Sequence, residues 1–342
     1  MGIVRLTHID GKLPNLALMK LAHWHRARGD EIRFTKQVRR ELGERDYDRV
    51  YGSAIFSASV GRVREFVTEF PEAIVGGTWD ITQPRTVEQI VGEAVYEHYD
   101  YSIYPRFDAS IGFSQRGCRL NCGFCVVPKM EGRPRSVNAI RDIWRGDPYP
   151  RHIHLLDNDF FGQPKDQWRA RIAEILDGGF RVCINQGVNL RLVDDEAAEA
   201  LASIPYYDDA FKKRRLYTAW DNLKDERIFM RGVERLRNAG IPPSHLMVYM
   251  LVGFDPAETW QRLFYRFGRM VELGIKPYPM VYGDRHRTLP LGGHNARIER
   301  RTLGEFQRWV VGKYYNFVEF ESYDVNARGK TSTGQLDLFG SI

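Results

Sequence analysis

The apolar positions of the chain alternate between two kinds of pattern. Short apolar runs, typical of buried parallel strands, alternate with segments whose apolar residues recur every three or four positions, as in an amphipathic helix. In the first hundred residues the strand candidates are 3–9, 31–36, 48–57 and 72–81, and the helix candidates are 16–30 and 60–70. This alternation predicts an α/β domain with a doubly wound, Rossmann-like parallel sheet.

The alternation becomes more regular from residue 109 onward. Six apolar runs are separated by five helical patterns, and several of these end at glycine, a frequent terminator of helices. The helix candidates are 136–144, 164–179, 194–204, 224–240 and 257–274. The strand candidates are 109–115, 152–159, 180–187, 214–222, 246–254 and 276–283. Successive strand–helix steps predict a partial (βα)6 barrel, and the active site of a barrel lies at the carboxyl ends of its strands.

The pattern divides the chain into four expected regions. These are a Rossmann-like domain at 1–100, a partial barrel at 101–283, a basic loop and helix at 284–328, and a flexible tail at 329–342. The tail is expected to be flexible because its composition changes abruptly to small and polar residues. No apolar run approaches the roughly 18 residues that cross a membrane, and no secretory signal is recognisable. We therefore expect a cytoplasmic location.

The charge of the chain is mildly basic. The sequence has 50 Lys and Arg against 44 Asp and Glu, a formal net charge of +6. This excess is compatible with a polyanionic partner such as nucleic acid, but a solvated basic surface is the commoner explanation.

Three of the four cysteines lie in GCRLNCGFCVVPKMEG, residues 117–132. Cys118, Cys122 and Cys125 follow the first strand of the predicted barrel with the spacing C-x3-C-x2-C. Three thiolates on one loop can bind three irons of a [4Fe–4S] cluster and leave the fourth iron open to a substrate or cofactor. A structural zinc site is the alternative, although no fourth ligand lies nearby in the sequence. The remaining cysteine, Cys183, is more typical of a small buried residue.

The stretch CRLNCGFC resembles the signature loop of the radical S-adenosylmethionine (SAM) enzymes, and its position after the first barrel strand matches that family. The resemblance covers residues 109–283. It implies that SAM chelates the open iron and is cleaved reductively to a 5′-deoxyadenosyl radical. It also implies that Phe124 lies near the adenine of SAM.

Polar residues at the ends of the later strands match further SAM-binding positions of that family. The resemblance implies that the second strand end receives the methionyl amine, that the fourth contacts the ribose, and that the turn at 252–259 lies near the adenine. The candidates are Asp157, Asn158, Asp159, Asn185, Gln186, Arg191, Asp221, Asn222, Gly253 and Glu258. Asp157, Asp159, Asp221 and Asn222 could instead cap the helices that follow them. No catalytic residue is assigned.

The first domain resembles the cobalamin-binding domains that precede the barrel in some radical SAM enzymes. Its stretch GGTWD, residues 76–80, resembles their glycine-rich turn. The usual Asp-x-His-x-x-Gly motif is absent, and the nearest string, HIDGKLPN, has a different order. Two interpretations stay open, a cobalamin site and a purely structural Rossmann-like domain.

The tail contains QLDLF, which resembles the peptide that bacterial replication and repair proteins use to bind the DNA sliding clamp. The implied contacts are Gln335, Leu336, Asp337, Leu338 and Phe339. The alternative is a tail that folds back onto its own domain. Clamp binding would favour DNA as the substrate and would make phosphate contacts of a group of loop arginines. These are Arg285, Arg287, Arg297, Arg300 and Arg301, although a solvated loop also explains them.

The sequence therefore predicts a radical SAM enzyme with a [4Fe–4S] cluster and an electron donor such as flavodoxin or ferredoxin. Its substrate is unidentified, with DNA or a nucleobase among the candidates and methylation among the reactions. The methylthiotransferase branch of the family, which modifies transfer RNA, is less attractive because its members need a second cluster and this chain has one spare cysteine. The competing classes are a zinc-stabilised nucleic-acid-binding protein and a clamp-associated adaptor without catalysis.

Overall fold

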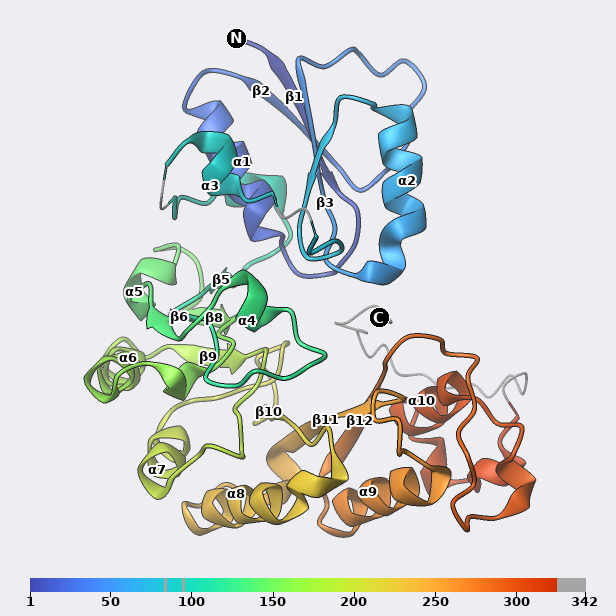
Figure 1. The fold of residues 1–342 in the computed structure, drawn as a ribbon. Coiled ribbons are helices and arrows are strands. Elements are labelled where there is room, and N and C mark those ends of the chain that lie inside the picture. The colour runs from blue at the N-terminus through green and yellow to red at the C-terminus, as the bar shows by residue number, and fades with distance from the viewer. Residues whose placement is uncertain (83–84, 94–95, 325–342) are drawn as a thin grey trace. The chain divides into compact units, whose positions relative to one another are not determined.

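The computed structural model describes residues 1–82, 85–93 and 96–324 (Figure 1). The chain divides into two units, one from Met1 to Asp108 and one that begins at Ala109. In the described ranges, every helix is too short or too polar to cross a lipid bilayer.

The first unit is built on a four-stranded parallel sheet with the order β2–β1–β3–β4. Its strands are β1 (Ile3–His8), β2 (Glu31–Thr35), β3 (Arg49–Ser53) and β4 (Ile74–Gly76). Its helices are α1 (Leu16–Arg26), α2 (Val60–Glu69) and α3 (Val87–Val91). Figure 1 shows α1 on one side of this sheet and α2 on the other.

The apolar residues of the first unit explain why its sheet is covered on both faces. Leu18 and Leu21 of α1 pack against Val4 and Leu6 of β1, and all four side chains are buried. A second cluster on the α2 side contains Val63 and Phe66. The helical spacing in the sequence thus corresponds to helices that bury one stripe against a strand.

The second unit contains two three-stranded parallel sheets whose strands lie in chain order, β5–β8–β9 and β10–β11–β12. The strands are β5 (Ser110–Gly112), β8 (His152–Leu155), β9 (Arg181–Ile184), β10 (Leu216–Ala219), β11 (Leu246–Val252) and β12 (Lys276–Val281). Between β9 and β10, the Val188 N–H donates to the Tyr217 carbonyl at 2.7 Å.

Helices separate these strands along the chain. They are α4 (Val127–Met130), α5 (Ile140–Ile143), α6 (Lys165–Asp177), α7 (Asp195–Ser203), α8 (Glu226–Asn238) and α9 (Trp260–Glu272), and α10 (Leu303–Val311) follows β12. Figure 1 shows α6 to α9 along the outer side of the strands. All seven residues of β11 are buried, as expected for a strand covered on both faces.

The prediction of an α/β fold with parallel sheets is confirmed. The strands are shorter than the apolar patterns at their carboxyl ends, where polar residues leave the sheet. The short helices α3 and α4 have no counterpart in the sequence pattern, and neither has a two-stranded antiparallel ladder of β6 (Gln115–Arg116) and β7 (Arg135–Ser136). Two residues a strand are too few to give a periodic signal.

Candidate functional site

The cysteine loop, residues 117–134, is closed at its base by the β6–β7 ladder. The Cys118 N–H donates to the Gly132 carbonyl at 3.2 Å. Gly117 has φ +81, and a Cβ on it would lie 2.3 Å from the Arg133 carbonyl oxygen. A side chain at this position would therefore force the two ends of the loop apart, so glycine is required here.

The three cysteines of this loop form no disulfide with one another, and their side chains are partly buried. Burial raises the pKa of Cys118 and of Cys125, so these thiols are protonated in the metal-free chain and would lose their protons to bind iron. Within residues 1–82, 85–93 and 96–324, no three His, Cys, Asp or Glu side chains are grouped closely enough to share one metal ion. In a cubane cluster, each thiolate binds a different iron, so the three cysteines need not be close enough to share one ion. The absence of such a group therefore leaves the cluster prediction untested.

Asp157, just beyond β8, fixes the segment that leads into the cysteine loop. It is completely buried and accepts hydrogen bonds from the Ser114 N–H at 2.7 Å and the Gln115 N–H at 3.1 Å, and another from the Ser114 hydroxyl. Burial raises its pKa to about 7. The side chain therefore holds β5 and β6 to the end of β8.

Asp159 binds an arginine of the cysteine loop itself. The Arg119 Nε donates to Asp159 Oδ2 at 2.7 Å and its Nη2 donates to Oδ1 at 2.9 Å, so the pair is bidentate. The Arg119 backbone N–H also donates to Asp159 at 3.2 Å. Because Asp159 is only 2% exposed, this is a partly desolvated, charge-assisted contact that fixes the loop between Cys118 and Cys122.

Asn158 reaches the same loop through Glu131. The Asn158 amide donates to Glu131 Oε2 at 2.7 Å, and the Gly117 N–H donates to that oxygen at 3.0 Å. Arg116 donates to the other carboxylate oxygen at 2.8 Å. The three polar residues that follow β8 thus all have side chains in contact with the loop or its base, and their predicted contact with the methionyl amine stays a prediction.

Arg191, in the loop after β9, brings a positive charge to the cysteines. Its Nη2 lies 3.7 Å from the sulfur of Cys122, and its Nη1 donates to Asp225 at 3.1 Å. Its neighbours in the prediction lie differently. The Asn185 side chain is buried against His154 at 3.1 Å, and Gln186 is exposed.

The ends of β10 and β11 are joined by polar contacts. The Leu251 N–H donates to Asp221 at 3.2 Å, and burial raises the pKa of this carboxyl. Asn222 donates to Asp255 at 3.3 Å, and its side-chain oxygen accepts from the Lys224 N–H at 2.9 Å. Asn222 therefore caps the short helical turn that follows, which is the alternative that the sequence left open.

Glu258 holds the turn after β11 in place. Its Oε2 accepts from the Gly253 N–H at 2.7 Å, and its Oε1 forms a buried ion pair with Arg266 of α9. Arg266 also donates to the carbonyls of Trp220 at 2.9 Å and Leu251 at 3.0 Å. Gly253 has φ +83, a conformation that favours glycine.

An aromatic contact joins the cysteine loop to the same turn. The ring of Phe124 meets that of Phe254 nearly at right angles, with centroids 5.3 Å apart, and Phe254 meets Tyr282 at 4.9 Å. The cysteine loop therefore contacts residues that follow β8, β9 and β11. Partly exposed rings beside the cysteines suit a flat heterocycle such as adenine.

Sequence reasoning missed the partners of the predicted residues. Arg119 lies inside the cysteine motif, which gave a signal for it. Glu131 is one acidic residue in a loop and gave none. Arg266 could have been noticed as a charge on the apolar stripe of α9, which also carries the buried Leu263 and Met270.

Three of the five predicted basic-loop arginines are used within the second unit. Arg285 donates to Gln307 at 2.9 Å, Arg287 donates to the Gly253 carbonyl at 2.9 Å, and Arg301 pairs with Glu305 at 3.1 Å.

The glycine-rich turn of the first unit is explained by its own packing. Gly77 has φ +103, and a Cβ on it would lie 1.9 Å from the Ala54 carbonyl oxygen. His8, at the end of β1, is buried, and its Nδ1 lies 3.0 Å from the Tyr104 hydroxyl. These residues give no specific support to a cobalamin site.

The predicted clamp-binding residues 335–339 lie outside the described residues.

Comparison with known proteins finds two related enzymes, both tRNA-2-methylthio-N(6)-dimethylallyladenosine synthases. The chain is 28% identical over 163 residues to the synthase of Sulfurihydrogenibium sp. (strain YO3AOP1). It is 29% identical over 161 residues to that of Aquifex aeolicus (strain VF5). The matches cover 43% and 42% of this chain but only 36% of the length of each synthase. No model of a protein family matches the chain, and no solved structure does.

This similarity supports the predicted class, an enzyme that uses an iron–sulfur cluster and SAM, and gives no support to the cobalamin-dependent subgroup. It runs against the expectation that the methylthiotransferase branch is the less attractive one, since both relatives are synthases of a methylthio-modified tRNA nucleoside. The observation behind that expectation is unchanged, because this chain has one cysteine besides the three of the loop.

Proposed function

We propose that this chain is a radical SAM enzyme that modifies a nucleic acid, with transfer RNA as the first candidate. The observation that carries the proposal is the cysteine loop, which holds Cys118, Cys122 and Cys125 together against residues that follow β8, β9 and β11. We also propose that the six strands of the second unit form a partial barrel and that the first unit is Rossmann-like. The similarity to two tRNA-modifying synthases supports the substrate class.

The three loop cysteines would hold the [4Fe–4S] cluster, which would supply the electron for reductive cleavage of SAM. The chain itself contributes position and electrostatics. Arg191 sets a guanidinium beside Cys122, where it offsets negative charge that gathers on the sulfur. Phe124 and Phe254 shield one side of the site from water.

The remaining predicted residues take two roles in this proposal. Asp157, Asn158 and Asp159 position the cysteine loop, because their side chains contact it or its base. The others lie at or just after the ends of β9, β10 and β11, where SAM would lie in this proposal, with Gly253 allowing a close approach to the backbone and Glu258 fixing its turn. They are Asn185, Gln186, Asp221, Asn222, Gly253 and Glu258.

The number of cysteines limits how many iron–sulfur clusters this chain could bind, and with it the type of reaction. Apart from the loop, the chain has only Cys183, which is fully buried in β9. A second cluster would have no cysteine ligands from this chain beyond that buried thiol. We therefore propose a radical modification of a base that uses one cluster and an external electron donor such as flavodoxin or ferredoxin. Clamp binding by residues 335–339, which would favour DNA, stays a prediction from the sequence.

Anaerobic reconstitution with iron and sulfide tests the proposal. We expect a brown protein that, after reduction, releases 5′-deoxyadenosine from SAM, or S-adenosylhomocysteine if it methylates. Cys122→Ala should abolish both the colour and the product, because the cluster would lose a ligand. Cys183→Ala is the matched control and should keep both, since this thiol is buried in a strand.

A different outcome would favour the competing class. A colourless wild-type protein that retains zinc and ignores SAM would favour the zinc-stabilised class without catalysis, and the proposal would then be wrong.

A further inference from the structure

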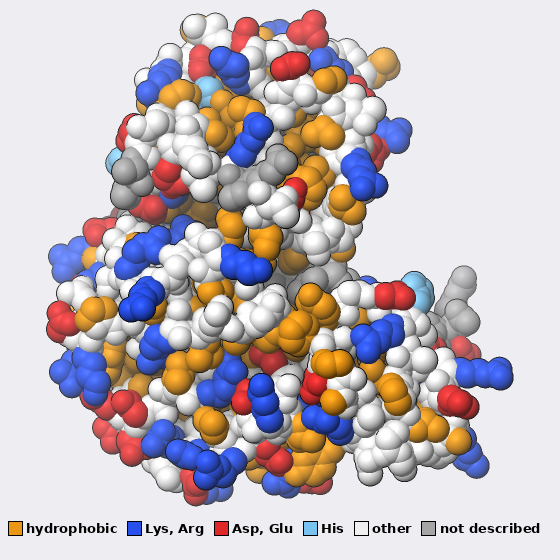
Figure 2. Space-filling model, in the orientation of Figure 1, with side chains coloured by type: hydrophobic (Ala, Val, Ile, Leu, Met, Phe, Trp, Pro, Cys, Tyr) orange, Lys and Arg blue, Asp and Glu red, His pale blue; other side chains and the backbone are white. Residues whose placement is uncertain are grey.

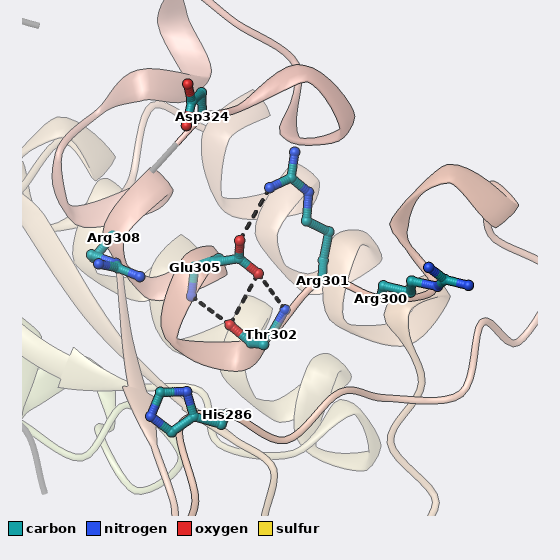
Figure 3. Close-up of a pocket in the computed structure, with 7 residues that line it drawn as sticks. All are labelled: His286, Arg300, Arg301, Thr302, Glu305, Arg308 and Asp324. Atoms are coloured by element: carbon teal, nitrogen blue, oxygen red, sulfur yellow. Dashed lines mark hydrogen bonds and ion pairs between the residues drawn. The ribbon is translucent and has the colours of Figure 1, made fainter. Parts of the chain in front are cut away.

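A groove of about 530 Å³ lies where the loop after β12 meets the start of α10 (Figure 3). Its lining contains three arginines and two acidic residues, with one histidine and one threonine. The lining residues are His286, Arg300, Arg301, Thr302, Glu305, Arg308 and Asp324.

The centre of the groove is occupied by the cap of α10. The Thr302 N–H donates to Glu305 Oε2 at 2.7 Å, and the Glu305 N–H donates to the Thr302 hydroxyl at 3.2 Å. Arg301 pairs with the other oxygen of Glu305 at 3.1 Å. The first turn of the helix and the charge of Glu305 are therefore satisfied within the protein, and this cap offers no anion site.

Two further arginines, Arg300 and Arg308, lie beside this cap. Arg300 and Arg308 are exposed, and neither guanidinium has a hydrogen bond or ion pair with any residue in the described ranges. Figure 3 shows them on opposite sides of the Thr302–Glu305 cap. Two separated cations suit a polyanion with repeated charges better than one small anion.

Overall charge would not have located this groove. On the face seen in Figure 2, Lys and Arg side chains are interleaved with Asp and Glu.

The groove is connected to the cysteine loop by a short series of contacts. His286, on the groove, precedes Arg287, whose Nη1 donates to the Gly253 carbonyl at 2.9 Å. The next residue, Phe254, meets Phe124 of the cysteine loop. The turn after β11 therefore joins the groove lining to the cysteine loop within the second unit.

We propose that this groove binds backbone phosphates of the nucleic-acid substrate through Arg300 and Arg308, and so presents a base to the cysteine loop. The inference rests on the proposed function, because it names how that same site obtains its substrate. Arginine suits this role because its planar guanidinium can donate two parallel hydrogen bonds to one phosphate.

Binding of bulk unmodified transfer RNA to the reconstituted full-length protein, measured by fluorescence anisotropy over a range of salt concentrations, tests the groove. Arg300→Gln/Arg308→Gln should weaken binding roughly tenfold near physiological salt and lower the slope of log affinity against log salt by about 1 to 2. The matched control is Arg227→Gln/Arg231→Gln, which removes the same charge from exposed arginines on α8 and should leave both quantities unchanged.

Equal losses in the two double variants would overturn the proposal, because they would report net charge rather than a site. It would also be wrong if the groove variant bound transfer RNA as the wild type does. Cleavage of SAM by the wild-type protein is measured separately. If SAM is cleaved while the groove variant binds RNA normally, the groove proposal is wrong and the proposed enzyme activity is supported. If SAM is not cleaved but the groove variant loses RNA binding, the groove proposal is supported and the proposed enzyme activity is wrong.

Discussion

Asp157 shows how one side chain can link the sheet to the cysteine loop. Its carboxyl is fully buried, and burial raises its pKa to about 7. Its partners are two backbone N–H groups and the Ser114 hydroxyl, and the hydroxyl can either donate or accept. A protonated Asp157 would therefore keep the two backbone bonds through one oxygen and donate to Ser114 with the other. The structure accommodates both protonation states, but the charged one carries the cost of burial.

This cost predicts a pH dependence of stability. The carboxyl has a folded-state pKa of about 7, above its unfolded value of about 3.9, so its contribution is fully present below the unfolded value and is lost as pH rises through the folded one. Asp157→Asn keeps the shape and removes the titration. From about pH 5 to about pH 8, the wild type should lose on the order of 2 kcal/mol more unfolding free energy than the variant.

Urea unfolding of the metal-free, reduced proteins at both pH values measures this difference. The comparison at each pH cancels the buried histidines His8 and His154, which both proteins share. Parallel pH profiles for the two proteins would mean that Asp157 does not titrate in this range.

The sequence identified several residues of the site but not the contacts that their side chains make. Cys118, Cys122 and Cys125 are recognisable because ligand spacing on a loop is local in the chain. Asp157 and Asp159 were correctly placed at a strand end, but their partners Ser114 and Arg119 lie about forty residues away. Such pairing depends on the register of neighbouring strands, which a single sequence does not contain.

Among the elements, the turn after β11 depends on a contact from the following helix. Arg266 of α9 is 1% exposed and joins Glu258 to the carbonyls of Trp220 and Leu251. One guanidinium therefore connects the ends of β10 and β11 with the turn that contacts Phe124. Removing one partner of such a buried pair leaves the other charge uncompensated.

Arg266→Met should lower the unfolding free energy by about 3 to 5 kcal/mol. The double variant Glu258→Gln/Arg266→Met should recover part of the loss, because it removes the uncompensated carboxylate and keeps an acceptor for the Gly253 N–H. Arg269→Met, on the exposed side of the same helix, is the control and should change stability by no more than about 0.5 kcal/mol. Denaturant unfolding monitored by circular dichroism measures all three. A double variant no more stable than Arg266→Met would argue against the ion pair.

Periodicity predicts elements well where burial is continuous and poorly where polar residues follow. The core of β11 and the helices α6, α8 and α9 correspond closely to their patterns, since each buries a long apolar face. The expected helix at 136–144 shrinks to the single turn of α5, Ile140–Ile143, because only its isoleucines are buried. The β6–β7 ladder has no pattern at all.

At the scale of the whole molecule, the chain consists of two units with separate cores, and the candidate site is built within the second. Cluster binding should therefore order one part of the protein and leave the other unchanged. The first unit serves as an internal reference for any effect of iron.

Hydrogen exchange followed by mass spectrometry tests this division. Reconstitution with iron and sulfide should slow amide exchange in residues 114–136 and 157–162, because ligand binding stabilises the segments that hold the loop. Exchange in β1 to β4 should not change. Uniform slowing throughout the chain would show that the two units respond together, and no slowing near the cysteines would contradict their role as ligands.

The closed base of the cysteine loop also affects how the protein would respond to damage by oxygen. Air destroys accessible iron–sulfur clusters, but the β6–β7 ladder, Gly117 and the Arg119–Asp159 pair hold the loop through contacts between protein groups. Loss of iron would then leave the thiols gathered and the fold intact. We expect such a protein to be repairable in place, needing fresh iron, sulfide and a reductant but no new synthesis of the chain.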